Sequence, residues 1–199
     1  FSAHDIRKLP ELFWKANINF LETLYSTETD IKTYNHEVCE LFSLRDQIVT
    51  MNLPYLYNAC KGMHFEKMKR LDKSSEGTQH LINKYGYNTK EALHAFRVLD
   101  FIARFAFSDF TDFGWALRYS DFSRDELLGI KNGFYCREEF ERLVKAKYEL
   151  FEKFERQYHS KMPNKELMEY IKSLIYKMIY KHILQAEVVD IEYNTFGGN

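Results

Sequence analysis

Turn-forming residues are scarce in this chain, and this scarcity limits the folds that are open to it. Only 8 glycines and 3 prolines occur in 199 residues. An all-β fold would normally need more of both at its turns. Apolar residues make up 45% of the chain, enough for one good-sized core. The sequence therefore predicts a mainly α, multi-helix domain with at most one short strand or hairpin near residues 114–120.

Apolar residues recur at helical spacing along most of the chain. A helix after Thr89 has the broadest apolar face, and Ser123 with Glu126 resembles a capping box that opens a short helix. The helices that we expect cover, in chain order, residues 6–13, 18–24, 38–48 (behind an Asn35 cap), 54–71, 80–85, 89–106, 123–132, 135–158 and 163–182.

Two segments do not follow the helical pattern. Residues 113–122 alternate apolar and polar positions after Gly114, which favours a short strand or extended segment. The tail after Gln185 is also expected to be extended. A polar loop at Asp72–Gly77 separates a helical segment over residues 1–72 from a helical domain over residues 73–199. We expect the two parts to pack into one continuous domain.

Bulk charge and cysteine content indicate the compartment and exclude some partners. The net charge is −1 with a pI near 6.7, so no global field draws the chain onto nucleic acid or membrane. The three cysteines, Cys39, Cys60 and Cys136, show no CxxC spacing and are interpreted as reduced, mostly buried thiols. No apolar run is long enough to span a bilayer. We therefore expect a cytoplasmic protein with no membrane partner.

One candidate site lies at the start of the strongest helix. Lys90, His94 and Arg97 are spaced i, i+4 and i+7, so all three project from one face near the helix N-terminus. Donor groups beside a helix N-terminus are suited to a triphosphate or an RNA phosphate. The alternative interpretation of this spacing is a solvated basic face with a histidine satisfied in the core.

A second basic stripe consists of Lys61, His64, Lys67 and Arg70 at spacings of three, with Lys69 beside it. It could bind RNA, although a solvated helix face explains the same pattern. The common nucleotide-binding and hydrolase motifs, namely Walker A, GxGxxG and GxSxG, do not occur in the chain. No HxxxH pair or clustered set of carboxylates completes a metal site.

Gly86–Leu99 matches the pattern GY-x-x-K-x-A-x-H-x-x-R-x-L. Three further stretches agree in the right order, Arg7–Leu24 (with Ile18 where a proline is usual), Lys61–Leu71 and Glu126–Gly133. Together they resemble a family of predicted nucleotidyltransferases of the DNA polymerase β superfamily, related to the RNA-ligase-associated nucleotidyltransferases. The match covers most of residues 5–150.

This resemblance implies that the chain is the helical half of a nucleotidyltransferase. The catalytic half of the superfamily carries a Gly-Ser turn and a D-x-D pair that holds Mg²⁺, and neither occurs here. We therefore expect either that this half precedes Phe1 or that its carboxylates have been lost. The intact enzyme would transfer a nucleotidyl group from an NTP to an unknown acceptor, whereas this chain alone would be inactive. The implied nucleotide- and phosphate-binding residues are Lys90, His94, Arg97 and Tyr87, and the implied acceptor-binding residues are Lys67, Arg70 and Lys131.

Two other functions remain open from the sequence. One is a non-catalytic helical adaptor, which fits the near-neutral charge. The other is an RNA-binding module that uses the basic stripe at residues 61–70. The partners expected under these readings are a nucleotide, RNA, or a catalytic half or other protein chain that completes the site.

Overall fold

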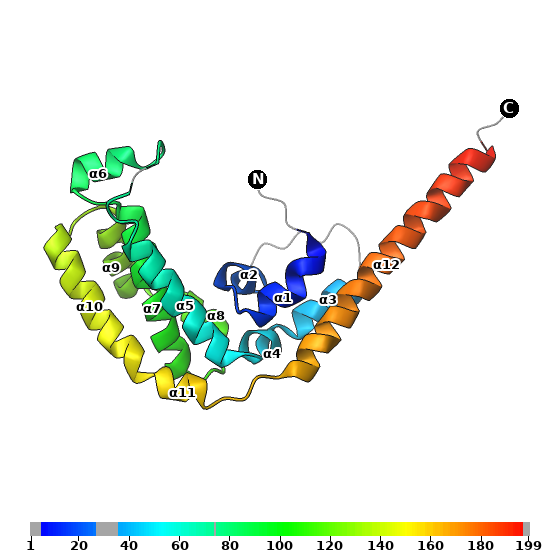
Figure 1. Cartoon of the computed structure of the whole chain (residues 1–199), viewed down its shortest axis with the longest axis horizontal. Coiled ribbons are helices and arrows are strands. Elements are labelled where there is room, and N and C mark those ends of the chain that lie inside the picture. The colour runs from blue at the N-terminus through cyan, green and yellow to red at the C-terminus, as the bar shows by residue number, and fades with distance from the viewer. Residues whose placement is uncertain (1–4, 27–35, 74, 197–199) are drawn as a thin grey trace.

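The structure is a computed structural model that describes residues 5–26, 36–73 and 75–196, with side chains described as far as Leu184. The described residues form helices and turns and no strand, which confirms the mainly α prediction (Figure 1). The elements up to residue 85 are η1 (Ile6–Lys8, a 3₁₀ helix), α1 (Leu9–Trp14), α2 (Ile18–Thr23), α3 (His36–Ser43), α4 (Arg45–Thr50), α5 (Leu53–Met68) and α6 (Gln79–Tyr85). The remaining elements are α7 (Thr89–Phe107), α8 (Phe113–Leu117), α9 (Asp121–Lys131), α10 (Arg137–Lys153), α11 (Glu155–His159) and α12 (Lys165–Phe196).

Helix α7 is the central element, with α5, α8, α9 and α10 packed around it. Its start is fixed by Asn88, whose Oδ1 accepts a hydrogen bond from the backbone N–H of Glu91 at 3.3 Å. Because residues on several sides of α7 are buried, it acts as a core helix rather than a surface helix. The close approach of α5 is seen at His64, whose Nδ1 lies 3.0 Å from the carbonyl oxygen of Ala95.

One cluster of buried apolar residues runs from Phe13 in α1 to Ile175 in α12. Aromatic rings form much of it. Phe113 packs edge-on against Phe101 and Phe105, with ring centroids 5.1 and 5.2 Å apart. Such edge-to-face pairs add to the free energy gained from burying the rings.

Helix α12 packs against α3, α1 and η1, and its later turns extend away from the rest of the chain (Figure 1). A buried carboxylate holds α12 to α3. Glu37 is 3% exposed and pairs with Lys181 and, at 3.6 Å, with Lys177. Two ammonium groups therefore share one carboxylate at this contact.

The extended segment expected at residues 113–122 is wrong for its first half. Residues Phe113–Leu117 form helix α8, capped by Asp112, whose Oδ1 accepts from the N–H of Trp115 at 2.7 Å. Phe113 and Ala116 are both buried, three residues apart, so one helical turn satisfies the apolar positions that were read as alternation. Only residues 118–120 link α8 to α9 without helical structure.

Helix boundaries differ from the predictions in further places. The helix expected over residues 38–48 is divided at Leu44 into α3 and α4. Helix α9 begins at Asp121 with Ser120 as N-cap rather than at Ser123. The helix expected over residues 135–158 is interrupted at Phe154, which separates α10 from α11. The last helix continues to Phe196, so the tail after Gln185 is helical in its backbone. The Asn35 cap lies outside the described residues.

The described helices include none with the length and apolar character needed to cross a membrane. All three cysteines are free thiols, but their exposure varies. Cys60 is buried, and its burial raises the thiol pKa to about 12. Cys136 is exposed, so the expectation of mostly buried thiols fails for this residue.

Candidate functional site

A pocket of about 500 Å³ lies where α6, the start of α7 and the end of α9 meet. Three of the residues singled out from the sequence line it together, namely Lys90, His94 and Lys131. The remaining lining residues are Gly77, Thr78, His80, Leu81, Tyr85, Thr89, Leu93 and Asn132.

Two left-handed backbone positions shape this pocket. Gly86, at φ +80°, ends α6, and the chain then reverses into the N-cap of α7. Gly133, at φ +69°, follows the end of α9. A Cβ atom at Gly133 would lie 2.1 Å from Cδ1 of Tyr85, so the ring packs directly on the glycine backbone. This contact sets the α6 wall of the pocket against the end of α9.

The pocket is lined by positively charged side chains and by no carboxylate. Lys90 comes from the first turn of α7 and Lys131 from the last turn of α9, and both are exposed. Neither lysine forms an ion pair with any residue that the structure describes. The lining residues include no Asp or Glu. An anion in this pocket would therefore meet two free ammonium groups and no opposing carboxylate.

His94 lies one helical turn beyond Lys90 on the same wall of the pocket. Burial lowers the pKa of its imidazole, and the positive charges of Arg97 and Lys67 lower it further. The ring is therefore held neutral in the free protein. An anion bound beside it would favour the protonated form, in which both ring nitrogens donate.

The backbone contributes to the same site. The pocket opens at the N-terminus of a helix of 19 residues, where the helix dipole favours negative charge. Thr89 lines the pocket and is 1% exposed, and its hydroxyl has no hydrogen-bond partner among the described residues. The arrangement can bind a phosphate, sulfate or carboxylate group.

Arg97 does not join this pocket, although its spacing predicted a shared face with Lys90 and His94. Its guanidinium pairs with Glu22 of α2, and both side chains are partly buried, with 35% and 28% of their surface exposed. The pair ties α2 to α7. Arg97 therefore acts on His94 through its charge rather than by lining the pocket with it.

The other predicted residues are engaged elsewhere. Tyr87 is fully buried, and its hydroxyl donates to the carbonyl oxygen of Tyr135 at 3.0 Å. Lys67 pairs with Glu91 at 2.9 Å. Arg70 pairs with Glu66 on the surface of α5. None of Tyr87, Lys67 and Arg70 lines the pocket.

The basic stripe on α5 is less basic than its sequence indicated. His64 is 4% exposed and stacks on Tyr148 at 5.4 Å, so it belongs to the core. Burial lowers the pKa of its imidazole. Lys61 lies 3.7 Å from Glu155 of α11. With Lys67 and Arg70 also paired, Lys69 is the member of this group without an ion pair among the described residues.

No three His, Cys, Asp or Glu side chains lie close enough to hold a metal ion in the described part of the chain. The Mg²⁺ that the resemblance implies therefore has no ligand set in this region.

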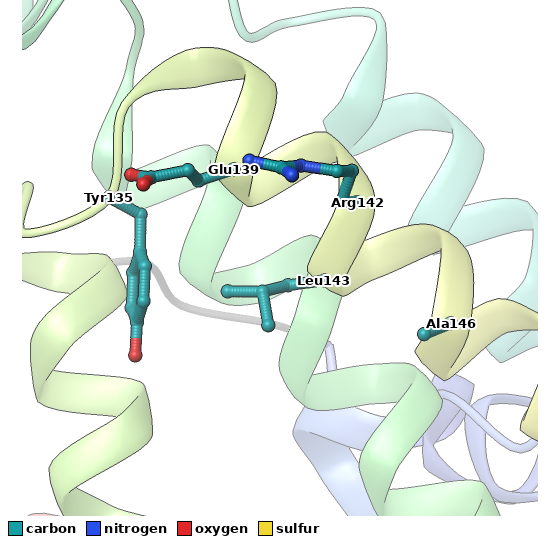
Figure 2. Close-up of a pocket in the computed structure, with 5 residues that line it drawn as sticks. All are labelled: Tyr135, Glu139, Arg142, Leu143 and Ala146. Atoms are coloured by element: carbon teal, nitrogen blue, oxygen red, sulfur yellow. The ribbon is translucent and has the colours of Figure 1, made fainter.

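A second pocket, of about 350 Å³, has a different character (Figure 2). Tyr135 and Leu143 project toward the same space, and Ala146 continues this surface along α10. Glu139 and Arg142 extend above them. A Cβ atom at Gly129 would lie 3.0 Å from the Tyr135 ring, so this ring rests closely on α9. Because its lining is largely apolar and its two charges are opposite, this pocket is less suited to an anion.

His80, Tyr85 and Asn132 also line the pocket between α6, α7 and α9, which we call the anion pocket, although no sequence motif pointed to them. His80 and Tyr85 come from α6, and Asn132 comes from the turn after α9. Tyr85 and Asn132 are 47 positions apart in the chain. Spacing along one helix carries no information about such neighbours. Comparisons with protein-family models, with curated proteins and with solved structures gave no match to this chain.

Proposed function

We propose that this chain is the nucleotide-binding helical part of a nucleotidyltransferase, and that the phosphates of the nucleotide bind in the pocket between α6, α7 and α9. Lys90 and Lys131 contact the phosphate oxygens, and His94 adds a further donor when it is protonated. The transfer of a nucleotidyl group to an acceptor, and the Mg²⁺ that it requires, belong to a catalytic half that this chain does not contain.

The observation that supports this proposal is the convergence of free cations. Lys90 and Lys131 lie 41 positions apart in the chain, yet both line one pocket that lacks carboxylates. Two exposed ammonium groups without an ion-pair partner among the described residues can both turn to the same bound anion, so such a site favours an anionic ligand. The sequence resemblance supplies the rest of the proposal, because Lys90 and His94 are part of the matched motif.

RNA binding on the α5 stripe has less support. Three of its cations are already held by carboxylates, and its histidine is buried. A phosphate backbone would have to displace these ion pairs before it could bind. A helical adaptor role has no observation that favours it over the anion pocket.

Calorimetric titration with each of the four NTPs and with inorganic tripolyphosphate tests the proposal. The variants are Lys90→Ala and Lys131→Ala, and the control is Lys145→Ala, an exposed α10 lysine that also lacks an ion pair among the described residues. Each charge-assisted contact is worth roughly 1.5–3 kcal/mol, so each pocket variant should weaken binding about tenfold or more. The control variant should bind as the unaltered chain does.

Binding of tripolyphosphate but of no NTP would support an anion site in the pocket and contradict nucleotide binding. If the chain binds none of these ligands, or if Lys145→Ala lowers affinity as much as the pocket variants do, the proposal is wrong. Circular dichroism of every variant shows whether a loss of binding reflects loss of fold.

A further inference from the structure

Further lysines without an ion pair lie in chain segments next to those that line the anion pocket. Besides Lys90 and Lys131, the lysines at positions 69, 73 and 84 are exposed and form no ion pair with described residues. We call Lys69, Lys73 and Lys84 the outer lysines. Helix α6, which carries Lys84, lies at the end of the molecule remote from α12 (Figure 1).

Contacts with the pocket walls place the outer lysines. The Nζ of Lys84 lies 4.9 Å from the ring centroid of Tyr85, which lines the pocket. The carbonyl oxygen of Lys73 accepts from Nδ2 of Asn88 at 3.4 Å, so this residue lies beside the start of α7.

Lys69 lies slightly further along the same surface. It is the C-cap of α5, in the segment that reaches α7 two residues later. There the carbonyl oxygen of Leu71 accepts from the backbone N–H of Asn88 at 2.8 Å. The three outer lysines therefore extend the positive charge from the pocket over the adjoining turn.

Most acidic residues in the stretch that precedes and opens α7 are already paired. Between residues 66 and 94, three of the four carboxylates are engaged in ion pairs. Glu66 pairs with Arg70, Asp72 with Arg137, and Glu91 with Lys67. Glu76 is the one carboxylate in this stretch without an ion pair among the described residues. The chain as a whole has a net charge of −1, so this end is a local exception.

An exposed aromatic residue adjoins the same end. Phe134 is 77% exposed and lies two positions after Asn132, which lines the pocket. An exposed ring next to a positively charged surface is typical of sites where a nucleic-acid base stacks.

From these features we infer that the pocket receives the terminal phosphate of a single-stranded nucleic acid, whose next phosphates lie on the outer lysines. The inference rests on the proposed phosphate site and specifies the ligand class that uses it. A single strand fits better than a duplex, because a pocket of about 500 Å³ admits one terminal nucleotide and not a paired end. Phe134 stacks on a base near this terminus.

Fluorescence anisotropy with single-stranded RNA tests the inference. The probes are a mononucleotide, a dinucleotide and an oligouridylate of about twelve nucleotides, the last with and without a terminal phosphate. One variant replaces Lys69, Lys73 and Lys84 by alanine. Its matched control replaces three exposed lysines that also lack ion pairs among the described residues, Lys145, Lys153 and Lys165.

The oligonucleotide should bind at least about tenfold more tightly than the mononucleotide, since several phosphates contribute. The outer-lysine variant should remove that gain and lower the slope of log K against log salt by about 2, from roughly 0.7 per lost contact. It should leave mononucleotide binding unchanged. Phe134→Ala should weaken oligonucleotide binding with little change in the salt slope.

Several results would overturn the inference while leaving the nucleotide proposal intact. They are equal affinity for the mononucleotide and the oligonucleotide, equal losses in the outer-lysine and control variants, and equally tight binding of a blunt duplex. Oligonucleotide binding that is unaffected by both Lys90→Ala and removal of the terminal phosphate would also overturn the inference, because the strand would then not use the pocket. The nucleotide proposal fails separately, if Lys90→Ala and Lys131→Ala leave NTP binding unchanged in the calorimetric titration.

Discussion

Gly133 and Tyr85 are in such close contact that a methyl group at residue 133 would lie 2.1 Å from Cδ1 of the ring. The glycine also has φ +69°, a backbone conformation that side chains disfavour. Two separate physical constraints therefore fix this residue as glycine. Because Tyr85 lines the anion pocket, the contact also links the stability of the fold to the shape of the site.

Three glycine-to-alanine variants should separate these constraints. Gly62→Ala, in the middle of α5 with open space around it, should stabilise the chain by about 0.5–1 kcal/mol. Gly86→Ala also has open space but φ +80°, so it should cost about 1–2 kcal/mol from backbone strain. Gly133→Ala adds the clash with Tyr85 and should cost more than Gly86→Ala. Urea unfolding of the three variants measures this order, and equal losses for Gly86→Ala and Gly133→Ala would contradict the close contact.

Two buried tyrosines should respond oppositely to loss of the hydroxyl. The Tyr158 hydroxyl donates to the carbonyl oxygen of Ile102 at 2.9 Å, so Tyr158→Phe should destabilise the chain by about 1–3 kcal/mol. The Tyr57 hydroxyl is buried and has no hydrogen-bond partner among the described residues, so Tyr57→Phe should be neutral or stabilising. The rings lie 5.6 Å apart, and the two variants therefore probe the same part of the core. Thermal unfolding by calorimetry compares them, and a clear loss in Tyr57→Phe would reveal a partner for its hydroxyl.

Anion binding should depend on pH through His94. Burial and neighbouring cations lower the pKa of this residue, whereas a bound anion raises it. Affinity should therefore increase as pH falls through the pKa of the bound state, and level off below the pKa of the free state. Titration with sulfate, which does not itself gain protons near neutral pH, measures the effect.

His94→Gln should remove this pH dependence while keeping part of the affinity from Lys90 and Lys131. His80 lines the same pocket, so His80→Gln serves as the control for a second imidazole. Unchanged pH dependence in His94→Gln would assign the effect to His80 instead.

The ion pairs of Glu37 should make the attachment of α12 sensitive to acid. The hydrogen bond from Lys181 lowers the pKa of this carboxyl, and the charges of Lys181 and Lys177 lower it further. The carboxylate then stabilises the fold at pH values above its unfolded pKa, and that stability is lost as pH falls through the lowered folded pKa. Glu37→Gln should therefore lower Tm at neutral pH, with a difference that disappears in acid.

Circular dichroism melts across this pH range measure the Glu37 effect. Glu169→Gln is the control, because Glu169 is 71% exposed and its pair with Lys172 lies on the surface of α12 itself. A Tm difference that persists in acid would show that Glu37 acts through packing rather than through its charge.

Local sequence rules predicted most of the helices. The broad apolar face after Thr89 placed the start of α7 at Thr89, where the structure has it, with Asn88 as the N-cap. The Asn132-Gly133 turn likewise marked the end of α9. Such signals work because caps and left-handed turns are interactions between residues close in the chain. The strand expected after Gly114 failed because the aromatic cluster around Phe113 rewards a helical turn that buries two positions three apart.

The candidate site shows the same division between local and tertiary information. From the sequence alone, the spacing of Lys90 and His94 determined that both lie on one face of a helix, because helical periodicity is a local property. Tertiary structure decided which cations are free. It paired Arg97 with Glu22 and brought Lys131 to the pocket from another helix. Ion pairing depends on which side chains packing brings within a few ångströms, and residues distant in the chain become neighbours only when the core has formed.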